Sequence, residues 1–372
     1  MQGFAYASQG ATTITFSGAS LYSSANRSII LSSGSTDFNL VGNPYASAID
    51  WTNDDHWARE NIKSDIWINC ADEPNDASFA TYNSTSGVCT NWDDNVGTGA
   101  GIIPPTQAFW VEVIAEPCTL QVMRQAQTHT TNVVNKKSAT SNPLIRLQAL
   151  RAGYTDEMVI FFHPNAAASI DKYDTRKKLG SGAYPQLYAP VTDGILAVNS
   201  LPIPSAGKQI VVPVTLQSTV AGSITLSLTE LKSLAEGSEV HLVDRLLDRT
   251  VNLMAEPSYT IELEGVGEVP DRLEVVITMG GQPGDEPIGG VNLIDAQTQP
   301  EITIYAHRKS IYVGNIEGRT HLEVVNAMGQ RVLSRKLEAQ GLNAIHTNLP
   351  AGIYIVSVRS QGGREVKRVF LE

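Results

Sequence analysis

The sequence predicts an all-β protein built from tandem antiparallel β-sandwiches, and three observations lead to this fold class. Nearly every periodic segment alternates apolar and polar residues with a period of two, which is typical of a half-buried strand. The 30 glycines and 18 prolines supply turns between short strands. Charged residues make up only 17% of the chain, and long amphipathic runs rich in Glu and Lys are missing from it.

The chain of 372 residues is long enough for two or three domains, and shifts in composition predict where they meet. We predict a first β-sandwich module at 1–130, a polar linker at 131–141 and a second β-sandwich at 142–280. A tether rich in glycine and proline is predicted at 281–297, because such a run cannot hold a strand ladder. The last domain then covers residues 298–372.

The predicted strands follow in order along the chain. In the first module they lie at residues 13–16, 38–41, 65–68 and 108–113, with one short strand near 79–82 inside the polar region 71–100. In the second sandwich they lie at 144–150, 157–162, 209–216, 223–228, 240–243, 259–263 and 273–278, with a helical turn at 229–235. In the last domain they lie at 301–305, 310–313, 321–325, 331–337, 343–347, 353–359 and 366–371, and Gly329 suits a tight hairpin turn.

Charge and hydropathy argue against two kinds of partner. The net charge of −11 argues against nucleic acid, because a phosphate backbone requires a basic stripe, and the short basic cluster at 176–178 is interpreted as a solvated face or a linker. No apolar stretch reaches the length needed to cross a bilayer, so we expect no membrane-spanning segment. No leader with a basic and an apolar region follows Met1, so we expect a first module truncated at its N-terminal side and a chain cut from a longer exported protein.

The three cysteines leave two interpretations open. Cys70 and Cys89 flank a polar stretch and suit a disulfide in an oxidising compartment, but three unpaired thiols fit the sequence equally well. Cys118 lies beside an alternating apolar segment, so we expect a buried thiol there. Metal binding through cysteine and histidine is not expected, because CxxC is absent and the seven histidines have no ligand spacing.

A search for catalytic motifs gives no candidate. The sequence contains no G-x-S-x-G elbow, no H-E-x-x-H, no Walker lysine after a glycine-rich loop and no dinucleotide-binding pattern. We therefore expect that the chain is not an enzyme in itself and carries no cofactor, with calcium as the one ion that remains to be considered.

Two groups of carboxylates beside tryptophans are the candidate ligand-binding residues. They are Trp51, Asp54, Asp55 and Trp57 in one group, and Trp92, Asp93 and Asp94 in the other. Paired carboxylates beside exposed aromatic rings fit a calcium site, a sugar-binding face or the acid and base of a glycosidase. The alternative is that the carboxylates cap turns and the tryptophans anchor loops to the core.

The last domain carries two motifs in a fixed order. These are VVNAMGQRV at residues 324–332 and NLPAGIYIVSV at residues 348–358, followed by the basic ending VKRV at residues 366–369. Together they resemble the type A C-terminal sorting domain of Bacteroidetes proteins that are cargo of the type IX secretion system. The resemblance covers about 70 residues, and the pair of motifs is far more specific than either motif alone.

The resemblance implies a seven-stranded Ig-like sandwich that the type IX translocon and its shuttle protein recognise. It further implies a surface sortase that removes the domain, and a route through the periplasm and outer membrane to the cell surface. The residues that would carry recognition are those of the two motifs and the basic ending: Asn326, Gly329, Gln330, Val332, Leu349, Gly352, Tyr354, Val356 and Lys367.

Two weaker resemblances lie upstream and favour the same compartment. Residues 40–51 (LVGNPYASAIDW) with 102–111 (IIPPTQAFWV), and residues 170–188 (IDKYDTRKKLGSGAYPQLY), resemble β-sandwich modules, jelly-roll or Ig-like, of large Bacteroidetes surface proteins. We expect these modules to be structural or adhesive, with a glycan or a host surface as the ligand to consider. The alternatives are a glycan- or calcium-binding adhesin module, or a spacer in a secreted hydrolase whose catalytic domain lies upstream.

Overall fold

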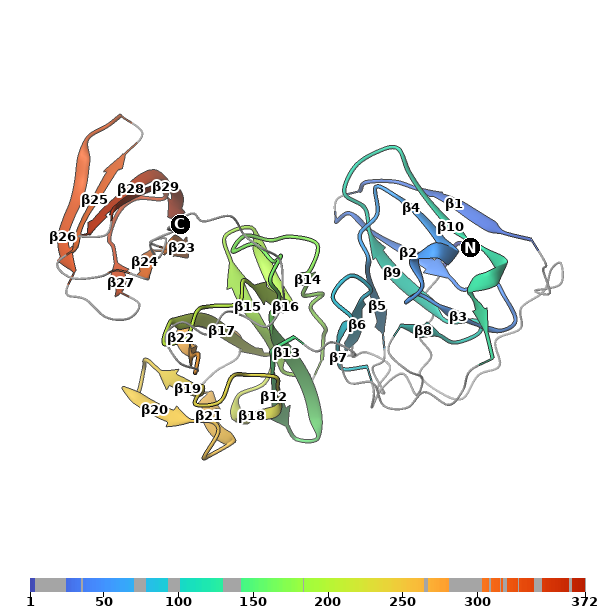
Figure 1. The fold of residues 1–372 in the computed structure, drawn as a ribbon, viewed down its shortest axis with the longest axis horizontal. Helices are drawn as coiled ribbons and strands as arrows, with labels where there is room; N and C mark the ends of the chain where they lie inside the picture. The colour runs from blue at the N-terminus through green and yellow to red at the C-terminus, as the bar shows by residue number, and fades with distance from the viewer. Residues whose placement is uncertain are drawn as a thin grey trace.

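The computed structural model describes residues 1–3, 25–34, 36–69, 78–92, 101–129, 142–182, 184–263, 267–280, 303–307, 309–314, 316, 320–326, 328–337, 343–360 and 363–371. In these residues the chain is all-β, which confirms the predicted fold class, and its sheets form three groups that follow one another along the chain (Figure 1). None of the helices in this part of the protein is long and apolar enough to cross a membrane. The predicted strand at 13–16, the linker at 131–141 and the tether at 281–297 lie outside the described residues.

The first group of sheets forms the first module. Its strands are β1 (Arg27–Leu31), β2 (Phe38–Gly42), β3 (Ala48–Asp50), β4 (Trp57–Glu60), β5 (Asp65–Asn69), β6 (Phe79–Asn83), β7 (Val88–Thr90), β8 (Ile102–Ile103), β9 (Ala108–Glu112), β10 (Cys118–Val122) and β11 (Gln127–Thr128), with short 3-10 turns η1 (Asp54–His56) and η2 (Arg124–Ala126). They form antiparallel sheets in the orders β2-β9-β5-β6-β7, β1-β10-β4 and β11-β3-β8. Their inward side chains pack one core, which includes Trp51, Phe109 and Leu120.

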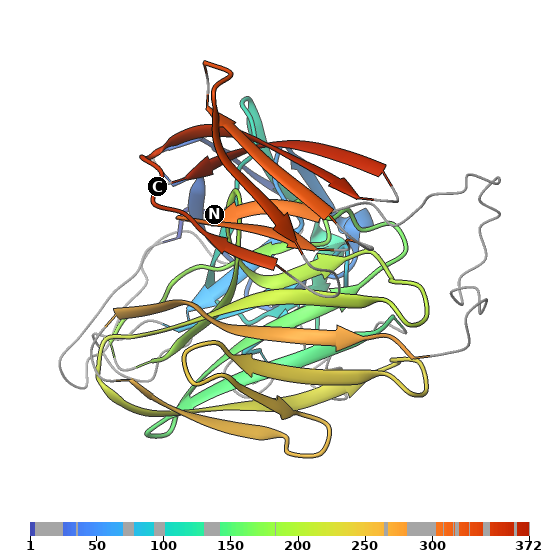
Figure 2. The same ribbon diagram turned by 90° about the vertical axis from the view of Figure 1, so that its left-hand side faces the viewer.

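The second module is one continuous, strongly curved set of strands. These are β12 (Leu144–Arg151), β13 (Tyr154–Phe162), β14 (Thr175–Arg176), β15 (Gln186–Val191), β16 (Gly194–Leu201), β17 (Gln209–Ser218), β18 (Gly222–Lys232), β19 (Glu239–Asp244), β20 (Arg249–Asn252), β21 (Ser258–Leu263) and β22 (Gly267–Thr278). Figure 2 shows several of its long strands running side by side. The order is β20-β19-β22-β17-β15-β16-β13-β12-β18-β21, and β14 pairs with β16. Both halves of this order supply side chains to one core, as in a sandwich.

Two details of the second module differ from the prediction. The helical turn expected at 229–235 is wrong, because β18 continues through Lys232, and Glu230 lies opposite Arg146 on β12 and forms an ion pair with it at 3.0 Å. The pairing is also not wholly antiparallel, since β13 and β16 run parallel. The β15–β16 hairpin is not among the predicted strands, because its residues are all buried or half-buried and so lack a clear alternation.

The last domain has the seven strands that the sequence predicts. They are β23 (Thr303–His307), β24 (Ser310–Gly314), β25 (Thr320–Asn326), β26 (Arg331–Leu337), β27 (Asn343–His346), β28 (Gly352–Ser360) and β29 (Gly363–Leu371). They form two antiparallel sheets in the orders β23-β24-β27 and β26-β25-β28-β29. Ile311, Val313, Leu322, Val324 and Val356 are buried in the shared core, so the domain is a small two-sheet sandwich.

Candidate functional site

The first predicted motif of the last domain closes the turn between β25 and β26. The side-chain oxygen of Asn326 accepts the N–H groups of Met328 and Gln330, each at 3.0 Å, and its amide donates to the Gln330 side chain at 2.9 Å. Gly329 has φ of +78°, a conformation that suits glycine because it lacks a Cβ atom. Asn326, Gly329 and Gln330 therefore hold one turn together, and Gly329 and Gln330 are exposed at its tip.

The second motif supplies core residues and one turn contact. Tyr354 and Val356 are buried, and the Tyr354 hydroxyl donates to the Pro350 carbonyl at 2.8 Å, which fixes the turn that contains Leu349 to the following strand. Gly352 begins β28. Tyr354 and Val356 cannot contact a partner in this folded form, because their side chains lie inside the sandwich.

Two further motif residues remain accessible to a partner. Lys367 lies opposite Val356 on the neighbouring strand β29 and is exposed. Val332 on β26 is 36% exposed. Of the predicted recognition residues, the accessible ones are thus the tip of the 326–330 turn, Val332 and Lys367.

The tryptophan group in the first module is part of the core. Trp51 and Trp57 are 0% and 6% exposed, and their ring centroids lie 4.5 Å apart. The indole N–H of Trp51 donates to the Ser64 carbonyl at 2.8 Å, and that of Trp57 donates to the Asp50 carbonyl at 2.7 Å. Of the two interpretations, this burial agrees with tryptophans that anchor loops to the core: apolar side chains surround both rings, and backbone carbonyls accept both indole N–H groups.

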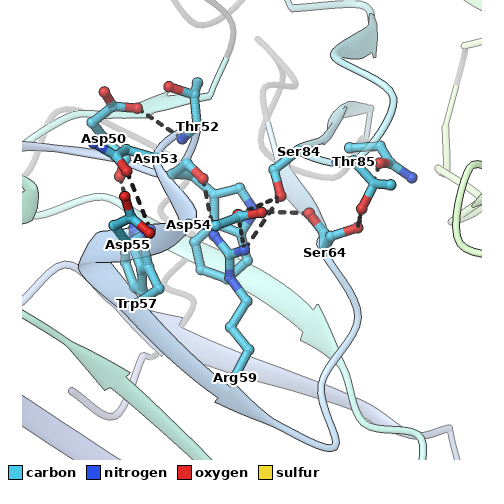
Figure 3. Close-up of polar contacts among 12 residues, drawn as sticks. Asp50, Thr52, Asn53, Asp54, Asp55, Trp57, Arg59, Ser64, Ser84 and Thr85 are labelled. Carbon is cyan, nitrogen blue, oxygen red and sulfur yellow. Dashed lines mark hydrogen bonds and ion pairs between the residues drawn. The ribbon is translucent and has the colours of Figure 1, made fainter.

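Arg59 contacts both this buried pair and the exposed Asp54, and Figure 3 shows its ion pair with Asp54. Its guanidinium lies 3.9 Å from the centroid of the Trp51 ring and donates to the Trp51 carbonyl at 2.9 Å. It also forms an ion pair with Asp54, whose side chain is 65% exposed and accepts a hydrogen bond from Ser84 at 3.1 Å. Burial lowers the pKa of Arg59 below its ordinary value. Asp54 therefore has a structural partner, and its ion pair covers the edge of the tryptophan core.

The neighbouring side chains cap turns, as the alternative interpretation predicts. Asp50 accepts the Thr52 N–H at 2.7 Å, and Asn53 accepts the Asp55 N–H at 3.2 Å at the start of η1 (Figure 3). Nowhere in the described residues do three His, Cys, Asp or Glu side chains gather as they would around a metal ion. Calcium binding at Asp54 and Asp55 stays a prediction without support from this geometry.

The second carboxylate group and the cysteine pair lie partly outside the described residues. Asp93, Asp94 and Cys70 are outside, so a calcium site at the two aspartates and a disulfide between Cys70 and Cys89 stay predictions. Trp92 is 1% exposed and packs edge-on against Tyr82, which shows that its ring is not a surface platform. Cys118 is buried as expected, and burial raises its thiol pKa.

A set of polar contacts joins the first two modules. The segment 170–178 of the second module lies along β5 and β6 of the first, where the ribbons meet in Figure 1. The Thr175 hydroxyl donates to Asp65 at 2.6 Å, and the Trp67 indole donates to the Arg176 carbonyl at 3.0 Å. The Asn83 amide donates to the carbonyls of Lys172 at 3.1 Å and Asp174 at 3.3 Å. We call this set of contacts the module interface.

A second part of the module interface surrounds Arg146. This side chain is 2% exposed and donates to the Cys89 carbonyl at 2.7 Å and to Glu157 at 2.9 Å. The backbone N–H of Asn91 donates to the same Glu157 oxygen at 2.7 Å. An apolar cluster beside it brings Val88 of the first module against Phe161 of the second. Polar and apolar groups thus close the interface together.

The basic cluster 176–178 belongs to this interface, so its interpretation as a solvated face or a linker is wrong. Lys177 is 8% exposed and forms a buried ion pair with Asp156. Lys178 is half-buried, and its ammonium lies 4.5, 5.3 and 4.1 Å from the ring centroids of three aromatic residues of the first module: Phe38, Phe79 and Trp110. Burial lowers the pKa of Lys178. The sequence offered one signal for this role, the 170–188 motif, but nothing in it identified the surface that it contacts.

Two buried carboxyls of the interface titrate at unusual pH. Burial raises the pKa of Asp65 to about 7, although the Thr175 hydroxyl and Lys63 oppose the change. Burial also raises the pKa of Asp174 to about 6, against hydrogen bonds from the N–H groups of Ser200 and Asp171. Both groups are protonated more readily in the folded protein than in an unfolded chain, so their protonation is coupled to folding.

Comparison with known families assigns both parts of the chain. The model described as a domain of unknown function (DUF8693) matches residues 6–277, which is well over half of the sequence. The chain belongs to the DUF8693 family. A second model, described as a secretion system C-terminal sorting domain, matches residues 299–372 of the DUF8693 chain. The protein is therefore cargo of the type IX secretion system, exported to the cell surface or the extracellular space.

Comparison with individual proteins adds less about the DUF8693 region. No curated protein matches the chain. A solved structure described as a biofilm associated protein, BSP domain, is 10% identical with a TM-score of 0.20, covering 87% of this chain and 58% of that one. Dimeric latent PorU from Porphyromonas gingivalis is 12% identical with a TM-score of 0.18, covering 84% of this chain and 30% of that one. The chain spans less than two thirds of either structure, and TM-scores this low support no argument.

Proposed function

We propose that the first two modules form one rigid body that serves as a structural display module of a cell-surface protein. In this proposal the sorting domain delivers the chain, and residues 1–280 then support or space whatever part of the protein contacts the surroundings. The chain itself breaks no covalent bond. Binding partners at the export stage are the translocon, the shuttle and the sortase of the type IX machinery, which read the sorting domain.

The observation that carries this proposal is the buried module interface. Asp65, Asn83 and Thr175 are each at most 1% exposed, and they bond across the boundary between modules. Two modules joined only by a flexible linker would expose such groups to water. Separating the modules here would break buried hydrogen bonds, which costs about 1–3 kcal/mol for each group left buried without a partner. The interface therefore favours two modules that move together, as a spacer requires.

The buried tryptophans favour a structural role over sugar binding at the predicted residues. A glycan-stacking face needs an exposed ring, and Trp51, Trp57 and Trp92 are all less than 10% exposed. An adhesive role for the display module would then rest on other surfaces. A position as spacer behind an upstream catalytic domain is fully compatible with the proposal.

Unfolding with two local probes tests whether the modules act as one body. All five tryptophans lie in the first module, so tryptophan fluorescence reports on that module alone. Hydrogen exchange of peptides from β12 to β22, measured by mass spectrometry in the same urea series, reports on the second module. We expect the two probes to give one common midpoint for the full chain. Two well-separated midpoints would refute the rigid display module.

A matched variant shows whether the interface is responsible. Asn83→Ala removes the amide that donates to the carbonyls of Lys172 and Asp174, and we expect the two midpoints to separate. Asp54→Asn alters an ion pair between the exposed Asp54 and Arg59, both within the first module. We expect the two midpoints of this variant to stay together. Equal behaviour of both variants would contradict the role assigned to Asn83.

A further inference from the structure

The sorting domain exposes apolar side chains on the outward face of its four-stranded sheet. We define the apolar face as Val325, Ile353, Ile355, Val366 and Phe370. The last four are 50%, 41%, 46% and 54% exposed, and Val325 is partly exposed. The alternate residues of the same strands, such as Val356 and Val369, point into the core instead.

The strand register joins these side chains into one patch. Ile353 on β28 lies opposite Phe370 on β29, and Ile355 lies opposite Val325 on β25. Val366 is opposite Ser357, two residues along β28 from Ile355. Directly opposite residues have Cβ atoms about 5 Å apart, and diagonal ones lie about 7–8 Å apart, within reach of long side chains. Val366 is thus a diagonal neighbour of Ile355, and the five side chains form one patch across three strands.

A solvated sheet face normally carries polar residues, and part of this sheet follows that rule. On the outward side of β26, Ser334 and Lys336 are exposed. Apart from Val332, which lies at the register shift of β26, the exposed apolar residues described on this sheet lie on β28, β29 and the end of β25. Their exposure is therefore a local feature of the surface. A contiguous apolar patch of this kind marks an interaction site on a soluble domain.

Basic residues flank the apolar face. Lys336, His321 and Arg359 form one cross-strand row at the end of the sheet away from Ile353, and Arg368 lies opposite Ile355 within the patch. The acidic residue among the described outward positions is Glu323, which forms an ion pair with Arg331 at 3.2 Å.

The whole domain has the same sign of charge as this face. Residues 299–372 contain ten Lys and Arg against six Glu and no Asp, a net charge of +4, whereas the full chain has −11 and its other 298 residues thus have −15. A surface complementary to the sorting domain must therefore combine an apolar centre with carboxylates around it.

We propose that the apolar face docks onto a protein surface of the type IX machinery that is apolar at its centre and acidic at its rim. This inference rests on the export role of the sorting domain and names the surface through which that role is carried out. The motif turn at 326–330 lies at the end of β25 next to Val325, so one partner surface can contact both the turn and the apolar face. The exposed residues Ile355 and Phe370 supply the apolar contact and Arg368 supplies the charge.

The test uses the full chain, with its export leader, in a bacterium that has an active type IX system. The face variant is Ile355→Ser with Phe370→Ser, and the charge variant is Arg368→Glu. The control is Leu246→Ser with Leu247→Ser, two leucines that are 70% and 60% exposed at the β19–β20 turn of the second module. Surface and periplasmic amounts are compared by immunoblotting, and melting curves confirm that each purified variant keeps the wild-type transition.

We expect the face variant to lose surface delivery by at least about tenfold and to accumulate in the periplasm, because each buried apolar side chain contributes on the order of a tenfold change in affinity. The charge variant should fall by a smaller factor, and the control should match the wild type. Wild-type delivery of both the face and the charge variant would overturn the docking surface while leaving export by the sorting domain intact. If the wild-type chain itself fails to reach the surface, the export role fails instead.

A vesicle experiment separates a protein partner from an anionic lipid. The purified full chain is mixed with vesicles of phosphatidylglycerol and with vesicles that contain lipopolysaccharide, and bound protein is measured by co-sedimentation. We expect no sedimentation that depends on Ile355, Phe370 or Arg368. Binding that the face variant abolishes, together with unchanged delivery of that variant, would assign the face to lipid and overturn the proposal.

Discussion

Replacing Asp65 by asparagine should remove a large part of the pH dependence of stability in the first two modules. Asp65 is 1% exposed, and burial raises its pKa from 3.8 to about 7. Between these values the folded state holds a proton that the unfolded chain has released, so the contribution of Asp65 to stability is fully present below pH 4 and is lost as the pH rises to about 7. The difference corresponds to an upper limit of ~4 kcal/mol of unfolding free energy lost between pH 4 and pH 8, at about 1.4 kcal/mol for each pKa unit.

The assay is urea unfolding followed by tryptophan fluorescence at pH 5, 6, 7 and 8. Trp67 lies two residues after Asp65 on β5, and its indole donates to the Arg176 carbonyl of the second module, so it is one of the five tryptophans that report the unfolding of the first module. We expect the wild type to lose several kcal/mol over this range and Asp65→Asn to show a much flatter profile. Asp174 is unchanged in the variant and its pKa of about 6 accounts for the residual slope.

Two results would refute this reasoning. If Asp65→Asn has the same pH profile as the wild type, Asp65 does not titrate with a raised pKa. If stability instead rises from pH 5 to pH 8, the carboxylate is stabilised in the folded protein and the effect of burial has been given the wrong sign. Asp54→Asn is the control, because Asp54 is largely exposed, and its profile should follow that of the wild type.

Substitutions at three further positions test other parts of the structure. Arg146→Met should lower the free energy of unfolding by about 3–5 kcal/mol in urea melts, because it leaves the Glu157 and Glu230 carboxylates without their buried cation; a loss below about 1 kcal/mol would contradict this. Lys178→Ala should cost about 1–2 kcal/mol in the same assay, because three aromatic rings lose their cation, while Lys178→Arg should retain most of the stability. Gly329→Val should lower the stability of the last domain by about 1–2 kcal/mol, measured by hydrogen exchange of its peptides, since φ is +78° there; Gly329→Asn should cost less, and equal costs would argue against backbone strain.

Local patterns were sufficient to predict most of the strands. The seven strands of the last domain appear where alternation predicts them, and β26 has the predicted bounds of residues 331–337. Turn chemistry was also readable, since Asn326 and Gly329 form the expected hairpin turn. These features depend on neighbours within a few residues, which is the range over which periodicity and turn preferences act.

Features that depend on distant residues could not be predicted in the same way. Lys177 and Lys178 form a charged dipeptide in the sequence, and only the fold brings Asp156 and the ring of Trp110 to them. Trp51 and Trp57 beside carboxylates have the same local composition whether they line a sugar site or a core. Their burial is decided by backbone acceptors such as the Ser64 carbonyl, whose position is a property of the packed module.

In the proposed function, residues 299–372 export a chain whose first two modules are displayed as one body. The most direct measurement is the location of the full chain, with its export leader, compared with the same chain lacking residues 299–372, in cells with an active type IX system. We predict that the full chain reaches the surface or the medium, where added protease can digest it, and that the shortened chain stays protected in the periplasm. A shortened chain that reaches the surface as efficiently as the full one would contradict the account.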